Sequence, residues 1–214
     1  PLSGLNSFKF IPKDLLIDNN SSINTVIMNF LSIDCSTDIG SLFIKSKSKT
    51  FIKVLQSDKF HSDLLMKQIL DFFKDNNLKF EDINCIFVNQ GPGSFSGLRG
   101  SLAVAKGISL SKNLELFGYN TFLWSCASLY RKKDFFYSLI KLRDKYFIKQ
   151  FDTNLKSISN ANEIKESEII KNYNNKFKVI IKNSIGAIDK KILKQNNLNI
   201  VDLDHNELEF LQVK

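Results

Sequence analysis

The chain has 214 residues, of which 43% are apolar and 24% charged, a composition typical of a globular protein that argues against wholesale disorder. Its formal net charge of +8 comes mostly from scattered lysines, because Arg99, Arg131 and Arg143 are the only arginines. This pattern favours a solvated basic surface over a dedicated nucleic-acid patch. No run approaches the roughly 20 apolar residues of a membrane span, and the first thirty residues lack a signal-peptide layout, so the sequence predicts a cytoplasmic protein.

The three cysteines, Cys35, Cys85 and Cys126, are odd in number, widely spaced and set within apolar stretches. This usage predicts free, buried thiols in a reducing compartment rather than a disulfide framework.

Hydrophobic periodicity predicts an α/β fold with two lobes. Residues 1–27 show no sustained period, so we expect an N-terminal extension that is not native or is poorly ordered, with a native start at Met28. A first lobe follows over residues 28–125 in the order βββαβαβα. Its predicted strands are Asn29–Asp34, Ser41–Ile44, Thr50–Leu55, Ile83–Val88 and Leu114–Tyr119, and its predicted helices are His61–Asn76, Gly97–Leu110 and Thr121–Tyr130.

The second lobe is predicted over residues 126–214, with the boundary between the lobes falling within 120–133. Paired strands are followed by alternating helices and strands, which indicates a second sheet. The predicted strands are Phe135–Lys141, Lys145–Phe151, Phe177–Ile181 and Leu198–Val201, and the predicted helices are Asn162–Tyr173 and Ile185–Gln195.

A glycine-rich loop, Gly91–Gly97, stands between a buried strand and a helix, where unpaired helix N–H groups could bind an anion. Its third glycine comes one residue too late for a dinucleotide fingerprint, and Gly97 is not followed by the lysine of a phosphate-binding Walker loop. Phe95 occupies the position where a nucleophile elbow carries serine. Two interpretations remain: the loop binds an anion, or its glycines and Pro92 only provide tight turn geometry.

Catalytic side chains are sparse. His61 and His205 are the only histidines, so no two-histidine zinc motif at helical spacing can form, and His61 is more typical of a helix cap or a surface position. Asp34 ends a strand where kinase-like folds use an acid for metal or water, although an Asp that initiates a turn is the more common case. No two acids are spaced to share one site, so general acid-base chemistry has no obvious location.

The stretch Val88-Asn89-Gln90-Gly91-Pro92-Gly93-Ser94-Phe95-Ser96-Gly97-Leu98-Arg99 resembles the GPGSFTGLR motif of the bacterial TsaB (YeaZ) family. Leu31–Thr37 resembles the opening strand of that family, and His61–Leu65 resembles the start of its first helix. The likeness extends from Met28 to Trp124, and Leu142–Phe147 is similar to a strand pair of the family's second lobe. Ser96 stands where the family has Thr, Gly100-Ser101 where it has Ile-Gly, and the chain after Asn199 is short for the family, which predicts a truncated second lobe.

The resemblance implies an actin-like and sugar-kinase-like fold (ASKHA, ribonuclease H-like) and a non-catalytic subunit with no cofactor and no metal. In that family TsaB pairs with TsaD, the transferase that forms threonylcarbamoyladenosine at position 37 of tRNA, and an ATPase, TsaE, completes the assembly. The two early helices would contact TsaD, tRNA would be reached through the complex, and the chain alone could homodimerise. The partner contacts implied are His61, Leu65, Ile69, Phe72, Leu98 and Leu102, together with the loop residues Gly91, Pro92, Gly93, Ser94, Phe95, Ser96, Gly97, Leu98 and Arg99.

Two alternatives belong to other classes of function. One is a kinase-like nucleotide-binding or hydrolysing enzyme that uses Asp34 and the loop around a phosphate, which fold analogy alone would support. The other is a peptidase, for which the sequence offers no constellation of serine, cysteine or metal ligands.

Overall fold

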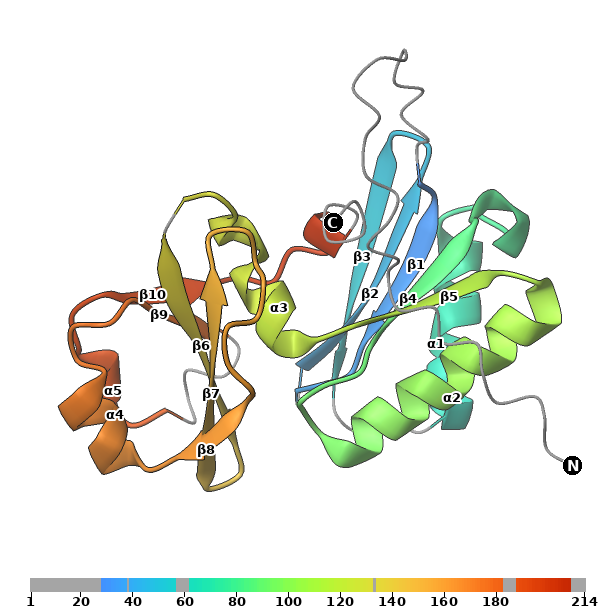
Figure 1. The fold of residues 1–214 in the computed structure, drawn as a ribbon. Coiled ribbons are helices and arrows are strands. Elements are labelled where there is room, and N and C mark those ends of the chain that lie inside the picture. The colour runs from blue at the N-terminus through green and yellow to red at the C-terminus, as the bar shows by residue number, and fades with distance from the viewer. Residues whose placement is uncertain (1–27, 38, 57–61, 133, 183–187, 209–214) are drawn as a thin grey trace, which may run out of the picture. The chain divides into compact units, whose positions relative to one another are not determined.

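The computed structural model describes residues 28–37, 39–56, 62–132, 134–182 and 188–208, so the extension predicted over residues 1–27 lies outside the described part. The chain divides into two compact units, and each contains one five-stranded sheet (Figure 1). The first unit holds the described residues up to Tyr119 together with Leu208, and the second holds Asn120–Glu207. None of the described helices is long and apolar enough to span a membrane.

The first unit is a mixed sheet in the order β3-β2-β1-β4-β5 with two long helices. β1 pairs antiparallel with β2 and parallel with β4, and β5 continues the parallel part. The elements are β1 Phe30–Asp34, β2 Ile39–Ser46, β3 Lys49–Gln56, α1 Ser62–Asp75, the short helix Phe80–Asp82, β4 Cys85–Asn89, α2 Phe95–Lys112 and β5 Glu115–Tyr119.

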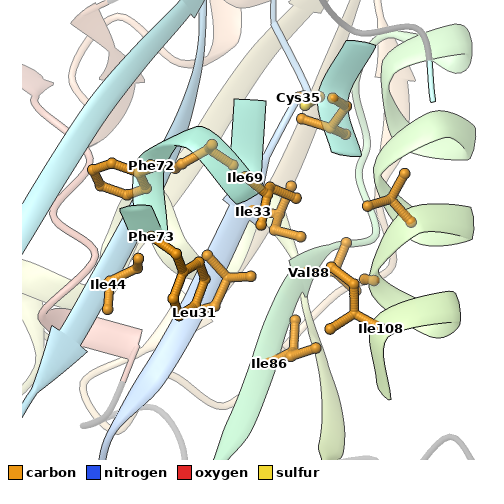
Figure 2. Packing of buried hydrophobic residues seen from close by; sticks show 14 of the residues in the cluster. Leu31, Ile33, Cys35, Ile44, Ile69, Phe72, Phe73, Ile86, Val88 and Ile108 are labelled. Atoms are coloured by element: carbon orange, nitrogen blue, oxygen red, sulfur yellow. The ribbon is translucent and has the colours of Figure 1, made fainter. Parts of the chain in front are cut away.

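One face of this sheet carries a hydrophobic cluster to which both long helices contribute. Side chains alternate along a strand, so Leu31 and Ile33 of β1 point to the same face. Figure 2 shows side chains of α1, among them Ile69 and Phe73, directed at those of β1, with Ile108 of α2 in the same cluster. Each buried aliphatic or aromatic side chain of this kind contributes about 2 kcal/mol of stability. The core therefore fixes both helices on the sheet.

Left-handed asparagines end both helices at positions where glycine is the usual choice. Asn113 caps α2 with φ of 52°, and its N–H bonds to the Ser109 carbonyl, while Asn77 follows α1 with φ of 55°. Lys74 and Lys112 lie in the last turns, where a positive charge interacts favourably with the helix dipole. Both helix ends thus follow from local sequence.

The second unit is a sheet in the order β10-β9-β6-β7-β8, with β6 and β7 forming an antiparallel hairpin. Side chains of α4 and α5, including Ile169 and Ile192, join the cluster on one face of this sheet. On β6, Leu139 belongs to that cluster, whereas its neighbour Ser138 bonds to Ser125 of α3 at 2.8 Å. The elements are α3 Thr121–Cys126, the short helix Ala127–Leu129, β6 Phe135–Leu142, β7 Lys145–Asp152, β8 Asn162–Ile164, α4 Glu166–Asn172, β9 Lys178–Ile181, α5 Lys190–Leu193 and β10 Leu198–Val201.

Two buried ionisable side chains stand out in the second unit. The Lys178 ammonium donates to the backbone carbonyls of Tyr173, Asn174 (3.2 Å) and Lys176 (2.8 Å), and its burial lowers the pKa to about 8. His205 is 2% exposed, and its ring lies 4.8 Å from that of Trp124. These two residues couple the second unit to pH.

The main strands and the two long helices begin and end within two residues of the predicted ranges, and three other regions differ more. The region predicted as one helix over Asn162–Tyr173 is β8 followed by α4, because Ile164 pairs with Tyr146 at the sheet edge before Lys165 begins the helix. α3 is shorter than the predicted Thr121–Tyr130. The helix predicted over Ile185–Gln195 is confined to α5 within the described residues.

Candidate functional site

The glycine loop joins β4 to α2 and is continuous with the helix. The helix begins at Phe95, two residues before the predicted start, because Ser94 acts as its N-cap and its hydroxyl accepts from the Gly97 N–H. Gly91 has φ of +94°, a conformation that glycine adopts without steric cost. The loop therefore consists of a turn over Gly91–Gly93 and the first turn of α2.

Close backbone contact holds this loop against the end of β1. The Ser94 N–H donates to the Ser36 carbonyl at 2.7 Å. A Cβ placed on Gly93 would lie 2.5 Å from the Ser36 carbonyl oxygen, and one placed on Gly97 would collide with the Cys35 carbonyl. These two positions require glycine because two backbone segments meet there.

A chain of buried polar groups connects β1, β4 and the loop. The Asn89 amide donates to the Asp34 carboxylate at 2.8 Å, and the Asn89 carbonyl oxygen accepts from the Gly91 N–H at 2.8 Å. The same Asp34 oxygen accepts from the Ser36 N–H at 3.1 Å, which confirms Asp34 as a residue that initiates a turn. Parallel pairing of β1 with β4 brings these residues together although 55 positions separate them in sequence.

Asp34 is 4% exposed, and burial raises the pKa of its carboxyl while hydrogen bonds from Ser36 and Asn89 oppose the shift. Burial also raises the pKa of the neighbouring Cys35 thiol, and the Asp34 carboxylate adds to that rise. A thiol that stays protonated is a poor nucleophile. The arrangement therefore suits a structural role for both side chains.

The loop's own hydrogen bonds favour turn geometry over anion binding. The N–H groups of Gly91, Ser94 and Gly97 all donate to protein oxygens, and the Leu98 N–H donates to the Ser94 carbonyl. An anion at the start of α2 would need such donors to be free. Within the described residues, no three side chains of the His, Cys, Asp or Glu type gather as metal ligands.

The outer part of the loop presents an exposed aromatic and cationic pair. Phe95 is 67% exposed, and the Arg99 guanidinium carbon lies 5.2 Å from the centre of its ring. Ser96 and Arg99 are also exposed. Stacking of a guanidinium on an aromatic face limits the motion of both side chains. Aromatic and arginine side chains of this kind are enriched among the residues that dominate protein interfaces.

The structure corrects the prediction for three interface residues. Leu65, Ile69 and Phe72 of α1 are at most 4% exposed and belong to the core of the first unit; Figure 2 shows Ile69 and Phe72 within that cluster. The sheet needs an apolar cover, and the apolar stripe of α1 provides it. Leu65→Asp should therefore destabilise the first unit itself, because the aspartate would be buried in this core.

The other predicted contacts are placed differently. Leu98 and Leu102 are partly buried, and Leu102 packs against the core. His61 lies outside the described residues. Leu98 and Leu102 can therefore contribute only part of their side chains to a surface.

Three exposed leucines on the two long helices were not among the predicted contacts. Leu64 and Leu70 of α1 and Leu110 of α2 are 42%, 47% and 75% exposed, and Gly107 of α2 faces open space. A helical projection contains the signal for them, since these leucines lie off the stripe formed by Leu65, Ile69 and the neighbouring core positions. Together with Phe95 and Arg99 they define what we call the α1–α2 surface.

Cys35, Cys85 and Cys126 are buried and form no disulfide, as predicted. In the second unit, burial raises the pKa of Cys126 to about 12, against the effect of hydrogen bonds from Ser125 and Ser138. Burial lowers the pKa of His205 to about 3. Burial thus keeps the Cys126 thiol and the His205 imidazole in their neutral forms and away from solvent, which does not favour a catalytic role.

Comparison with known proteins connects this site to one family. A family model described as TsaD, tRNA N6-adenosine threonylcarbamoyltransferase, matches residues 55–135, a stretch that contains the loop and both long helices. The tRNA threonylcarbamoyladenosine biosynthesis protein TsaB of Buchnera aphidicola subsp. Baizongia pistaciae is 35% identical over 89 residues, covering 42% of this chain and 40% of that protein. TsaB of Escherichia coli K12 is 25% identical over 105 residues, covering 49% and 46%. The chain spans about half the length of the curated relatives it matches.

The fold agrees over a longer range. YeaZ from Pseudomonas aeruginosa superposes with a TM-score of 0.64 at 14% identity, covering 87% of this chain and 90% of that one. The chain is thus a mixed α/β protein of the predicted actin-like, sugar-kinase-like class. Within that class, the chain is similar to the TsaB/YeaZ family in its TsaB relatives, in the TsaD family model and in the YeaZ fold.

Proposed function

We propose that this chain is a non-catalytic, cytoplasmic accessory subunit in the biosynthesis of tRNA N6-threonylcarbamoyladenosine at position 37, and that it binds and activates a TsaD-type transferase. The observation that carries the proposal is the exposed pair Phe95 and Arg99 on a rigidly held loop, within the stretch that matches the TsaD family model. The names of the TsaB relatives support the pathway.

The α1–α2 surface is the proposed contact. Leu64, Leu70 and Leu110 provide exposed apolar area on the two helices, and Phe95 with Arg99 lies at the start of α2. Exposed apolar side chains and an aromatic and arginine pair are residue types found in protein interfaces. The partly buried Leu98 and Leu102 would lie at the edge of the contact, His61 remains a proposed contact, and the same surface would serve a homodimer of the chain alone.

A non-catalytic role is supported by the state of the polar groups. The Asp34 carboxylate is buried and bonded to Ser36 and Asn89, and Cys35 is buried beside it. In the kinase-like alternative Asp34 would have to release these bonds to reach a metal or a water. A TsaE-type ATPase would bind the assembled complex, and tRNA would be reached through it.

The test is complex formation and activity with the TsaD counterpart. Light scattering after size-exclusion chromatography should show a stable complex, and tRNA threonylcarbamoylation by the mixture should depend on this chain. Phe95→Ala combined with Arg99→Glu should weaken the complex by about 10- to 100-fold, which corresponds to about 1.5 to 3 kcal/mol at an interface anchor. Leu110→Glu tests the second helix.

Val54→Glu is the matched control, because Val54 lies on β3 and is 65% exposed, close to the 75% of Leu110. It should leave complex formation unchanged. Equal affinity of the wild type and both α2 variants would refute the proposed surface. Absence of any complex, together with nucleotide hydrolysis by this chain that Asp34→Ala abolishes, would replace the proposal by the kinase-like alternative.

A further inference from the structure

The connection between Asp34, Asn89 and the loop is more specific than turn formation requires. The Asn89 side chain uses its amide group toward Asp34 and its carbonyl oxygen toward the Gly91 N–H, each at 2.8 Å. Asp34 in turn accepts from the Ser36 N–H, and the Ser36 carbonyl accepts the Ser94 N–H at the N-cap of α2. The loop is thus bonded at its first residue and at its last one before the helix.

Burial makes this connection stiff. Asn89 and Ser36 are at most 2% exposed and Asp34 is 4% exposed, so water cannot easily replace a lost partner. A buried group left without a partner is costly, and satisfied buried networks specify one arrangement of their surroundings. The glycines at positions 93 and 97 leave no free space between the loop and β1.

The exposed pair Phe95 and Arg99 follows directly after the segment of the loop that this hydrogen-bonded chain holds. Phe95 follows the Ser94 N-cap, and Arg99 lies one helical turn later, so a rotation of the first turn of α2 would move both side chains. The apolar core contacts of α2, such as Val104 and Ile108, begin further along the helix, and before them Gly97 is buried against the Cys35 backbone. The hydrogen-bonded chain and this backbone contact together fix the start of α2.

We infer that Asp34 and Asn89 are positioning residues that set the direction of Phe95 and Arg99 for the partner. The effect on partner binding rests on the proposed function. The positioning of Phe95 and Arg99 by these hydrogen bonds rests only on the geometry of the isolated chain. Asp34 acts as a neutral or charged acceptor, so an asparagine at position 34 can accept the same two bonds. An alanine at position 34 or 89 cannot.

Two measurements separate the mechanism from its consequence. The first is amide hydrogen exchange of the isolated chain, read on peptides that cover residues 91–99. Asn89→Ala and Asp34→Ala should raise exchange in these peptides at least tenfold and leave β2 and β3 unchanged, while Asp34→Asn should recover most of the protection. Unchanged exchange at 91–99 in both alanine variants, with each folded, would overturn the inference even where the chain binds no TsaD.

The second measurement is a double-mutant cycle for TsaD binding. Asn89→Ala should weaken the complex about tenfold in the wild-type background and less than threefold when Phe95 and Arg99 are already alanine. A loss of equal size in both backgrounds would mean that Asn89 acts through general stability, and would overturn the inference. Failure of the wild type itself to bind TsaD would refute the proposed function, leaving the exchange result to decide on positioning.

Discussion

Replacing His205 by phenylalanine should make the second unit less sensitive to acid. The imidazole is buried against Trp124, and burial lowers its pKa to about 3 against an opposing effect of the Asp204 carboxylate. In the unfolded chain the side chain titrates near its usual pKa of about 6.5. Between these two values the unfolded state binds more protons than the folded one, so the stability of this unit decreases as pH falls through 6.5 toward 3.

The size of the effect follows from the same two values. With a folded pKa of about 3, the contribution of His205 to the free energy of unfolding falls by about 2 kcal/mol between pH 7 and pH 5. Glu207 acts in the opposite direction, because burial and the Asp204 charge raise its pKa to about 7. Glu207 is present in both the wild type and His205→Phe. Its contribution therefore cancels when the free energies of unfolding of the two proteins are subtracted.

Trp124 is the only tryptophan of the chain, so its fluorescence reports unfolding of the second unit. Urea titrations at pH 7, 6 and 5 should show the wild type losing about 2 kcal/mol more than His205→Phe over this range. Phenylalanine keeps a ring beside Trp124. Any loss of packing or hydrogen bonding in the variant changes its free energy of unfolding by the same amount at every pH, so it does not affect the comparison. Parallel pH profiles for the two proteins would refute the burial argument.

Further predictions concern the loop and the second unit. Gly97→Ala should destabilise the first unit because its Cβ collides with the Cys35 carbonyl, whereas Gly107→Ala, in open space within α2, should stabilise it by about 1 kcal/mol; thermal unfolding followed by circular dichroism should give shifts of opposite sign. Lys178→Met should cost the second unit about 2 to 4 kcal/mol, since at least three backbone carbonyls lose a charged donor, and a urea midpoint equal to the wild type would contradict this.

The order of elements in the first unit could be predicted because its signals are local. The apolar stripe of α1 and the nearly continuous apolar run of β4 identify these elements, although the Ser94 N-cap that starts α2 at Phe95 was not recognised. The Asn162–Tyr173 region was wrongly predicted as one helix, because β8 has three residues and is too short to show a hydrophobic period. Short edge strands depend on their partner strand rather than on their own sequence.

The candidate site could be predicted from the sequence only in part, for two reasons. A helical stripe such as Leu65 and Ile69 looks the same whether it covers its own sheet or a partner, and the sheet here required the cover. The bond between Asp34 and Asn89 depends on parallel pairing of β1 with β4, which no spacing in the sequence reveals. Position in the fold, rather than residue type, gives Asp34 its role.

Several turns of this protein place a non-glycine residue in the left-handed backbone conformation, and these positions are candidates for stabilising substitutions. Among the described residues, left-handed conformations occur at seven non-glycine positions, including Lys47, Arg131, Arg143 and Leu155, while glycine is retained where the loop meets β1. A long or branched side chain in that conformation costs roughly 1 kcal/mol relative to glycine. Arg143 is exposed, so Arg143→Gly should raise the stability of the second unit, whereas Leu155 is buried and its replacement by glycine would leave a cavity.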